Sequence, residues 1–210
     1  MNLTEMRTKV RRDLRDEDSE NYRWTDDEID RHIEHALVMF SDAVPLEQTV
    51  DVATTAASME LDISSITDRV MVNAVEYPLD ESPKSYNRFS LWGDILTLLG
   101  DVVPDGADCT IYYGKIQTLS ADTSAIPSKH EYLDSLGAVG YALVAWAAFA
   151  INQVNLGGTA TPGIFNTQGQ EKLKQFRSEL RRLGRRGIVR VARSYTPAAP
   201  IVSESSDPGP

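Results

Sequence analysis

The sequence predicts an α+β protein in which a helical bundle carries an inserted antiparallel β meander and ends in an extended C-terminal arm. Apolar residues recur at helical spacing in residues 1–46, and short alternating runs fill residues 47–118. Residues 128–184 return to helical patterns, which predicts that a central and a C-terminal helix complete the bundle. Residues 185–210 are basic and then Pro/Ser-rich, which predicts the arm. With 210 residues, 41% of them hydrophobic, the chain is long enough to bury a core.

Two N-terminal helices are expected to pack against each other. The apolar positions of the first share one face, at spacings of three and four: Leu3, Met6, Val10 and Leu14. The second helix begins with a capping box, in which Thr25 is the N-cap and Glu28 returns the hydrogen bond. Its apolar stripe stops before Pro45: Ile29, Ile33, Leu37, Phe40 and Val44.

Six short runs predict strands between residues 47 and 117. They read QTVDVATT, SMELDIS, RVMVNAVEYP, NRFSLWG, DILTLLG and DCTIYYGKI. Turn-forming residues separate them: Pro78, Asp80 and Pro83, then Gly93 and Asp94, then Pro104, Asp105 and Gly106. Connections this short favour antiparallel pairing, since parallel strands need long crossovers.

A long helix is expected from residue 129 to about 155, and residues 136–151 within it carry no charge. A membrane span needs about 20 apolar residues, and the many small residues lower the hydrophobicity here. We therefore favour a helix buried inside a bundle or an assembly, with a transmembrane helix as the alternative. Small side chains let other backbones approach closely, so four of them are predicted to pack against neighbouring protomers: Gly137, Gly140, Ala147 and Ala148.

The C-terminal part of the chain differs in charge from the rest. A helix is expected from about residue 166 to 183, with Leu173, Phe176, Leu180 and Leu183 on one face; Gly184 and Gly187 are expected to end it, before a strand-like VRVARSY. Residues 170–195 hold nine Lys or Arg against two Glu, a net charge of +7, whereas the remainder carries 12 against 29, a net charge of −17. A segment that docks a partner, one that contacts DNA and a merely solvated helix end are the three interpretations.

No feature of the sequence points to catalysis, a cofactor or a metal. His32 and His35, one turn from Glu28, have ligand-like spacing but fit a solvated helix surface. His130 is expected in a polar first turn, and no nucleophile elbow, phosphate-binding loop or paired-cysteine spacing occurs. Cys109 is the single cysteine and the N-terminus lacks a secretory pattern, so we expect a cytosolic protein without disulfides. All three tryptophans are expected to pack in the core.

Three stretches resemble the head-tail adaptor, or connector, proteins of tailed bacteriophages and gene transfer agents. They are YRWTDDEIDRHIEHAL, GYALVAWAAFAINQVN and KLKQFRSELRRLGRR, and the order of elements agrees across nearly the whole chain. The resemblance implies a structural, non-enzymatic homo-oligomeric ring, usually a dodecamer, beneath the portal protein at the virion neck. It implies assembly in the host cytoplasm, no membrane, a stopper or tail protein on the far side, and genomic DNA passing through the channel without specific binding.

The resemblance also implies a portal-docking arm. Its residues would be Arg185, Arg186, Ile188, Val189, Arg190, Val191, Arg193 and Tyr195. Two alternatives are a tail-completion or stopper neck protein and a small DNA-binding packaging accessory protein that sets residues 181–193 against phosphates. The net charge of −10 disfavours general DNA binding, because duplex binding needs a continuous basic face. The resemblance leaves open which face the β insertion presents.

Overall fold

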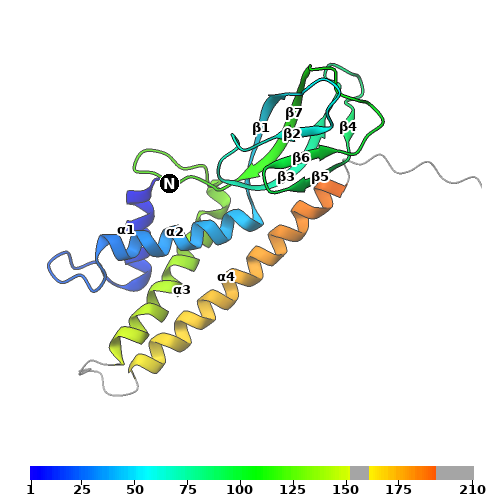
Figure 1. The fold of residues 1–210 in the computed structure, drawn as a ribbon. Coiled ribbons are helices and arrows are strands. Elements are labelled where there is room, and N and C mark those ends of the chain that lie inside the picture. The colour runs from blue at the N-terminus through cyan, green and yellow to red at the C-terminus, as the bar shows by residue number, and fades with distance from the viewer. Residues whose placement is uncertain (152–160, 193–210) are drawn as a thin grey trace, which may run out of the picture.

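A helical unit and a β unit make up the protein (Figure 1). The structure, a computed structural model, describes residues 1–151 and 161–192, with side chains through residue 185. The helical unit consists of α1 (Leu3–Leu14), α2 (Asp26–Ala43), α3 (Glu131–Ala150) and α4 (Thr161–Ala192), and a short 3-10 turn, Ser128–His130, precedes α3. The strands lie between α2 and α3 in the chain. The predicted α+β class and the inserted antiparallel strands are therefore confirmed.

Both N-terminal helices begin with reciprocal side-chain caps. Asn2 and Glu5 form a capping box at α1, and Thr25 and Glu28 form the predicted one at α2. In the second box the Thr25 amide donates to Glu28 Oε2 at 2.8 Å, and the Glu28 amide donates to Thr25 Oγ1 at 3.3 Å. These bonds satisfy amides that would otherwise lack partners in the first turn. They also set where α2 begins relative to the loop before it.

Helix α3 is the centre of the helical unit and contacts α1, α2 and α4. Its buried residues join those of the other three helices in one apolar core, whose largest fully buried side chains include Met6, Ile33, Phe40, Leu133 and Phe176. Among the described residues, the segment Ser128–Ala150 is the helix long and apolar enough to cross a membrane by length and composition. Most of that segment is buried within the helical unit, as expected for a bundle core helix.

Two glycines allow α3 to lie close to its neighbours. A Cβ on Gly137 would come within 2.9 Å of Ala36 Cβ and of Phe176 Cζ. A Cβ on Gly140 would come within 2.8 Å of the Leu173 side chain. Both distances are shorter than van der Waals contact, so any larger residue has to push α2 or α4 away.

We expect Gly140→Leu to destabilise the protein by about 1–3 kcal/mol, because the added side chain overpacks the α3–α4 contact. Gly163→Leu on α4 is the matched control, since a Cβ there meets nothing within 4 Å. Urea unfolding of both variants measures the difference. Equal midpoints for the two variants would contradict close packing at Gly140.

The β unit contains two antiparallel sheets. One has the order β1-β7-β3-β4 and the other β2-β6-β5. Strands adjacent in sequence pair at β3–β4 and β5–β6, whereas β1 pairs with β7 and β2 with β6. The chain thus closes the unit by bringing its first and last strands together. The strands are β1 (Leu46–Ala53), β2 (Glu60–Asp62), β3 (Arg69–Glu76), β4 (Tyr86–Asn87), β5 (Phe89–Trp92), β6 (Ile95–Leu98) and β7 (Asp108–Lys115).

The β unit has its own core, to which both sheets contribute. Leu96 of β6 and Ile111 of β7 are fully buried there, together with the single cysteine, Cys109. Gln117, which follows β7, connects this unit to the helices: its amide donates to Ser41 Oγ at 3.0 Å and its Nε2 donates to the Val44 carbonyl at 2.9 Å. The exit of the β unit is therefore attached to the C-terminal end of α2, where the chain entered.

Helix α4 is longer than the sequence pattern predicts. It continues through Gly184 and Gly187 to Ala192, so the expected helix end at these glycines and the strand-like reading of residues 189–192 are wrong. A glycine inside a helix costs about 1 kcal/mol relative to alanine but does not end it. The arginines on either side of these glycines favour helix. Leu180 and Leu183 pack into the helical core just before them, which supports continuation.

Candidate docking surfaces

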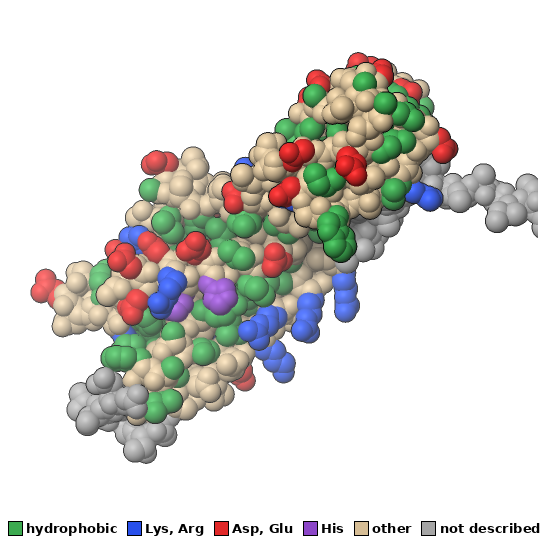
Figure 2. Space-filling model, in the orientation of Figure 1, with side chains coloured by type: hydrophobic (Ala, Val, Ile, Leu, Met, Phe, Trp, Pro, Cys, Tyr) green, Lys and Arg blue, Asp and Glu red, His purple; other side chains and the backbone are tan. Residues whose placement is uncertain are grey.

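The outer face of α4 carries a line of exposed cations. Lys174, Arg177, Arg181 and Arg185 follow one another at spacings of three, four and four residues, and all are exposed. The opposite face is apolar and buried through Leu173, Phe176, Leu180 and Leu183, so packing in the core directs the cations to the surface. Figure 2 shows Lys and Arg side chains gathered along this edge of the molecule. We call Lys174, Arg177 and Arg181 the basic face.

The residues predicted to form the portal-docking arm lie largely in helix. Arg185 is exposed on α4. Arg186, Ile188, Val189, Arg190 and Val191 belong to the last two turns of α4, while Arg193 and Tyr195 lie outside the described residues. The expectation of an extended arm from residue 185 is therefore wrong for residues 185–192.

The small residues predicted to pack against neighbouring protomers divide into two groups. Gly137, Gly140 and Ala147 are buried inside the protomer, against α2 and α4 in the case of the glycines, so their assignment to an oligomer contact is wrong. Ala148 alone of the four is exposed. Small side chains indicate close approach of another backbone, but they do not say whether it belongs to the same chain.

An exposed tryptophan at the β5–β6 turn was missed by the sequence argument. Trp92 is 90% exposed, and Leu91 and Ile95 beside it are also exposed. The turn requires the left-handed backbone of Gly93, with φ of 60°. The expected core position of Trp92 is therefore wrong, whereas Trp24 is buried in the helical core and Trp146 packs against that core. The sequence contained one signal for this position of Trp92. The Gly-Asp pair that follows it directly forms a tight hairpin turn, so Trp92 lies at the end of its strand and of the sheet.

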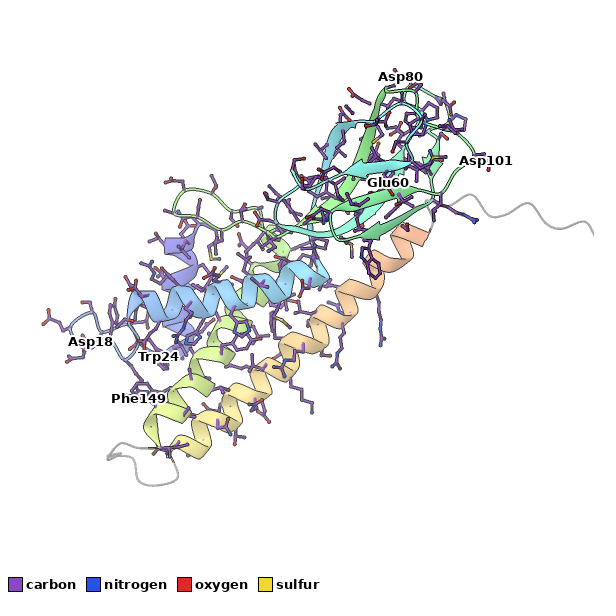
Figure 3. All side chains as sticks on the ribbon, in the orientation of Figure 1. Asp18, Trp24, Glu60, Asp80, Asp101 and Phe149 are labelled. Atoms are coloured by element: carbon purple, nitrogen blue, oxygen red, sulfur yellow. The ribbon has the colours of Figure 1, made fainter. Side chains whose placement is uncertain are left out.

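Exposed acidic side chains lie on the outer face of α2, which also carries the exposed cation Arg31. Asp27, Glu34 and Asp42 are exposed and recur at spacings of seven and eight residues, which places them on one side of the helix. We call them the acidic face. Figure 2 shows carboxylates over the α1–α2 side of the helical unit and over the β unit. Labelled examples on the β unit are Glu60, Asp80 and Asp101 (Figure 3).

The histidines have structural surroundings. His32 is buried, so its expected position on a solvated helix surface is wrong, and burial lowers its pKa to about 4. The His35 ring stacks on Tyr141, with ring centroids 3.9 Å apart, and the His130 ring lies 5.9 Å from that of Phe40. The Glu28 carboxylate is engaged in the α2 cap. Within residues 1–151 and 161–192, no group of three His, Cys, Asp or Glu is placed to hold a metal ion.

A comparison with known proteins identifies the family of the chain. No curated protein matches the chain. A family model described as SU10 adaptor protein matches residues 1–201. Since this match covers nearly the entire length, including both N-terminal helices, the β unit and α4, the chain belongs to the SU10 adaptor protein family of phage head-tail adaptors.

Proposed function

We propose that the protein is a head-tail connector that forms a ring under the portal protein, docks on the portal through the C-terminal end of α4 and the residues after it, and surrounds the DNA with an acidic wall. One observation carries the proposal: a phage adaptor chain with a −17 body concentrates its positive charge on the exposed side and final turns of one long helix. A local, directional charge of this kind suits docking on a protein partner.

The acidic body supports passage of DNA without binding. Carboxylates repel phosphates at short range, and the repulsion decays over a screening length of about 8 Å at physiological salt. A channel wall of this sign keeps DNA mobile. The accessory-protein alternative needs a continuous basic surface for phosphates, and the described part of the chain offers one line of cations on one helix. The stopper alternative is disfavoured by the family, which is that of an adaptor.

The placement of the β unit suggests how the ring is oriented. Helix α4 runs from the free end of the helical unit toward the β unit (Figure 1). If the end of α4 docks on the portal, the β unit and its exposed Trp92 belong to the portal-proximal half. The stopper or tail protein then meets the opposite end, where Phe149, Ile151 and Ile164 are exposed. Figure 3 labels Phe149 at that end, distant from Asp80 on the β unit.

Charge reversal at the end of α4 tests portal docking. We expect replacement of Arg185, Arg186, Arg190 and Arg193 by Glu to leave the protein folded and to abolish its co-migration with purified portal in size-exclusion chromatography with light scattering. A matched control reverses four other cations that are exposed: Arg12, Arg15, Arg88 and Lys129. Portal binding that survives the first set, or that is lost equally with the control set, would refute docking through this segment.

A further inference from the structure

We propose that neighbouring protomers of the ring contact each other through opposite charges, with the basic face of α4 on one copy set against the acidic face of α2 on the next. The inference rests on the proposed ring and adds which surfaces meet in it. It also separates two uses of α4: Lys174, Arg177 and Arg181 face a second copy of this chain, while the turns from residue 185 onward face the portal.

Among the described residues, no carboxylate forms an ion pair with the basic face. The ion pair on this part of α4 joins Arg182 to Glu179. Lys174, Arg177 and Arg181 make no ion pair with any residue that the structure describes, although they are exposed and lie on consecutive turns. Three unpaired cations in a row on a protein of net charge −10 form a site for a negatively charged surface.

The acidic face is likewise unpaired, in contrast to the carboxylates next to it. Asp26 and Asp30 are held by Arg7, with nitrogen–oxygen distances of 2.9 and 2.6 Å. Glu34 and Asp42 are in no ion pair among the described residues and point to solvent. Val38 lies one turn from each of them and is 40% exposed, so the face has an apolar centre flanked by charges. Such a centre suits a protein contact.

One protomer cannot join its own two faces. Helices α2 and α4 both bury their apolar sides against α3, through residues such as Phe40 and Phe176. Their charged sides therefore point outward, and Figure 2 shows the carboxylates and the Lys and Arg line on different parts of the surface. Two different, complementary surfaces on one chain generate a head-to-tail contact, and such contacts close into rings when the rotation between copies permits.

A second copy fits the basic face better than DNA does. A line of uncovered cations in a ring that conducts DNA would retain the phosphates, whereas carboxylates from a neighbour neutralise it. The dimensions are also compatible. Residues 174–181 extend about 10 Å along α4 and residues 34–42 about 12 Å along α2, at a rise of about 1.5 Å per residue.

A charge swap tests the proposal on the full chain. Variant X carries Arg177→Glu and Arg181→Glu; variant Y carries Glu34→Arg and Asp42→Arg. Asp27 is left unchanged because a carboxylate in the first turn stabilises α2. The matched control is Arg12→Glu with Lys129→Glu, which reverses two exposed cations outside the basic face. Thermal unfolding first confirms that each variant folds, as expected for changes confined to exposed side chains.

Analytical ultracentrifugation then measures assembly at low and high salt. Each variant alone is expected to need a roughly tenfold or higher concentration for half assembly than the wild type, because like charges face each other at every contact. An equimolar mixture of X and Y is expected to assemble again, with the two copies alternating. The control is expected to assemble like the wild type, and wild-type assembly is expected to weaken as salt rises.

The alternative outcomes are distinct. If X and Y each assemble like the wild type, or if their mixture stays unassembled, the charge contact is wrong while the ring stands. If the wild type remains monomeric both alone and with portal, the ring and the contact both fail. If the wild type, but not X, is retained by duplex DNA at physiological salt, DNA is the occupant of the basic face and the proposal is overturned.

Discussion

Raising the pH from 5 to 8 is expected to lower the free energy of unfolding of the wild type by about 3 kcal/mol relative to that of Asp134→Asn. Asp134 lies in the first turns of α3 and is fully buried. Neither of its carboxylate oxygens accepts a hydrogen bond from any group that the structure describes. Burial raises its pKa from 3.8 to about 7, and the charge of Lys9 offsets this only in part.

The sign follows from proton binding in the two states. Between pH 4 and 7 the folded chain keeps the Asp134 proton while the unfolded chain has lost it, so folding takes up a proton and stability falls as the pH rises. The full effect is about 4 kcal/mol for a shift of about three pH units. The raised pKa of about 7 lies about two units above pH 5, and two units correspond to the expected 3 kcal/mol. Asparagine does not titrate, so its stability lacks this slope.

Urea unfolding at pH 5, 6, 7 and 8, at one protein concentration, measures the effect. His32 has the opposite slope, because its lowered pKa of about 4 means that the folded chain loses stability as the pH falls below 6.5. It is present in both proteins and cancels in the comparison. Asp122→Asn is the control, since it makes the same replacement at an exposed carboxylate outside the acidic face. Parallel curves for wild type and Asp134→Asn would show that Asp134 does not titrate abnormally.

Sequence patterns predicted the elements because most of them are set by local chemistry. The Thr25–Glu28 box begins α2, and the apolar stripe of α2 is buried as expected. The alternating runs of the insertion all appear as strands. The pairing of these strands could not be predicted, because Val50 of β1 meets Ile111 of β7 across some sixty residues of intervening chain. No local pattern encodes such a partner.

The surfaces were harder to predict than the elements. Burial within the protomer and burial between protomers both favour small apolar residues, so Gly137 and Gly140 gave no means of choosing between them. The continuation of α4 past Gly184 depends on packing before the glycine, not on the glycine itself. The net charges of the two parts of the chain were readable from the sequence. Their division into one face on α2 and another on α4 required the fold, which orients each helix against α3.

A buried ion pair joins the end of α1 to the loop that leads to α2. Arg11 and Asp16 are 6% and 7% exposed, and Arg11 Nη1 lies 2.8 Å from Asp16 Oδ2. Asp16 also accepts hydrogen bonds from the backbone amides of Arg23 and Trp24, at 2.7 and 3.3 Å. Arg11 donates to the Trp24 carbonyl at 3.0 Å. One carboxylate thus neutralises a buried cation and fixes the chain just before the α2 cap.

Replacing Asp16 with alanine is expected to lower the free energy of unfolding by about 3–5 kcal/mol, because the buried Arg11 cation then keeps a single acidic partner, Asp26, among the described residues. Two backbone amides also lose their acceptor. Glu17→Ala is the matched control: its pair with Arg12 spans 3.6 Å between exposed side chains, and such pairs contribute about 0–1 kcal/mol. Urea unfolding compares the two.

A further variant separates loss of the pair from loss of the loop geometry. Arg11→Met in the Asp16→Ala background removes the buried charge, so it is expected to recover part of the lost stability. If Asp16→Ala costs no more than Glu17→Ala, the pair is unimportant for folding. The pair also sets the position from which α2 starts, and the acidic face lies on α2. If the proposed ring forms, Asp16→Ala should therefore also weaken its assembly at a temperature where the variant remains folded. Ultracentrifugation detects this effect, and Glu17→Ala should not reproduce it.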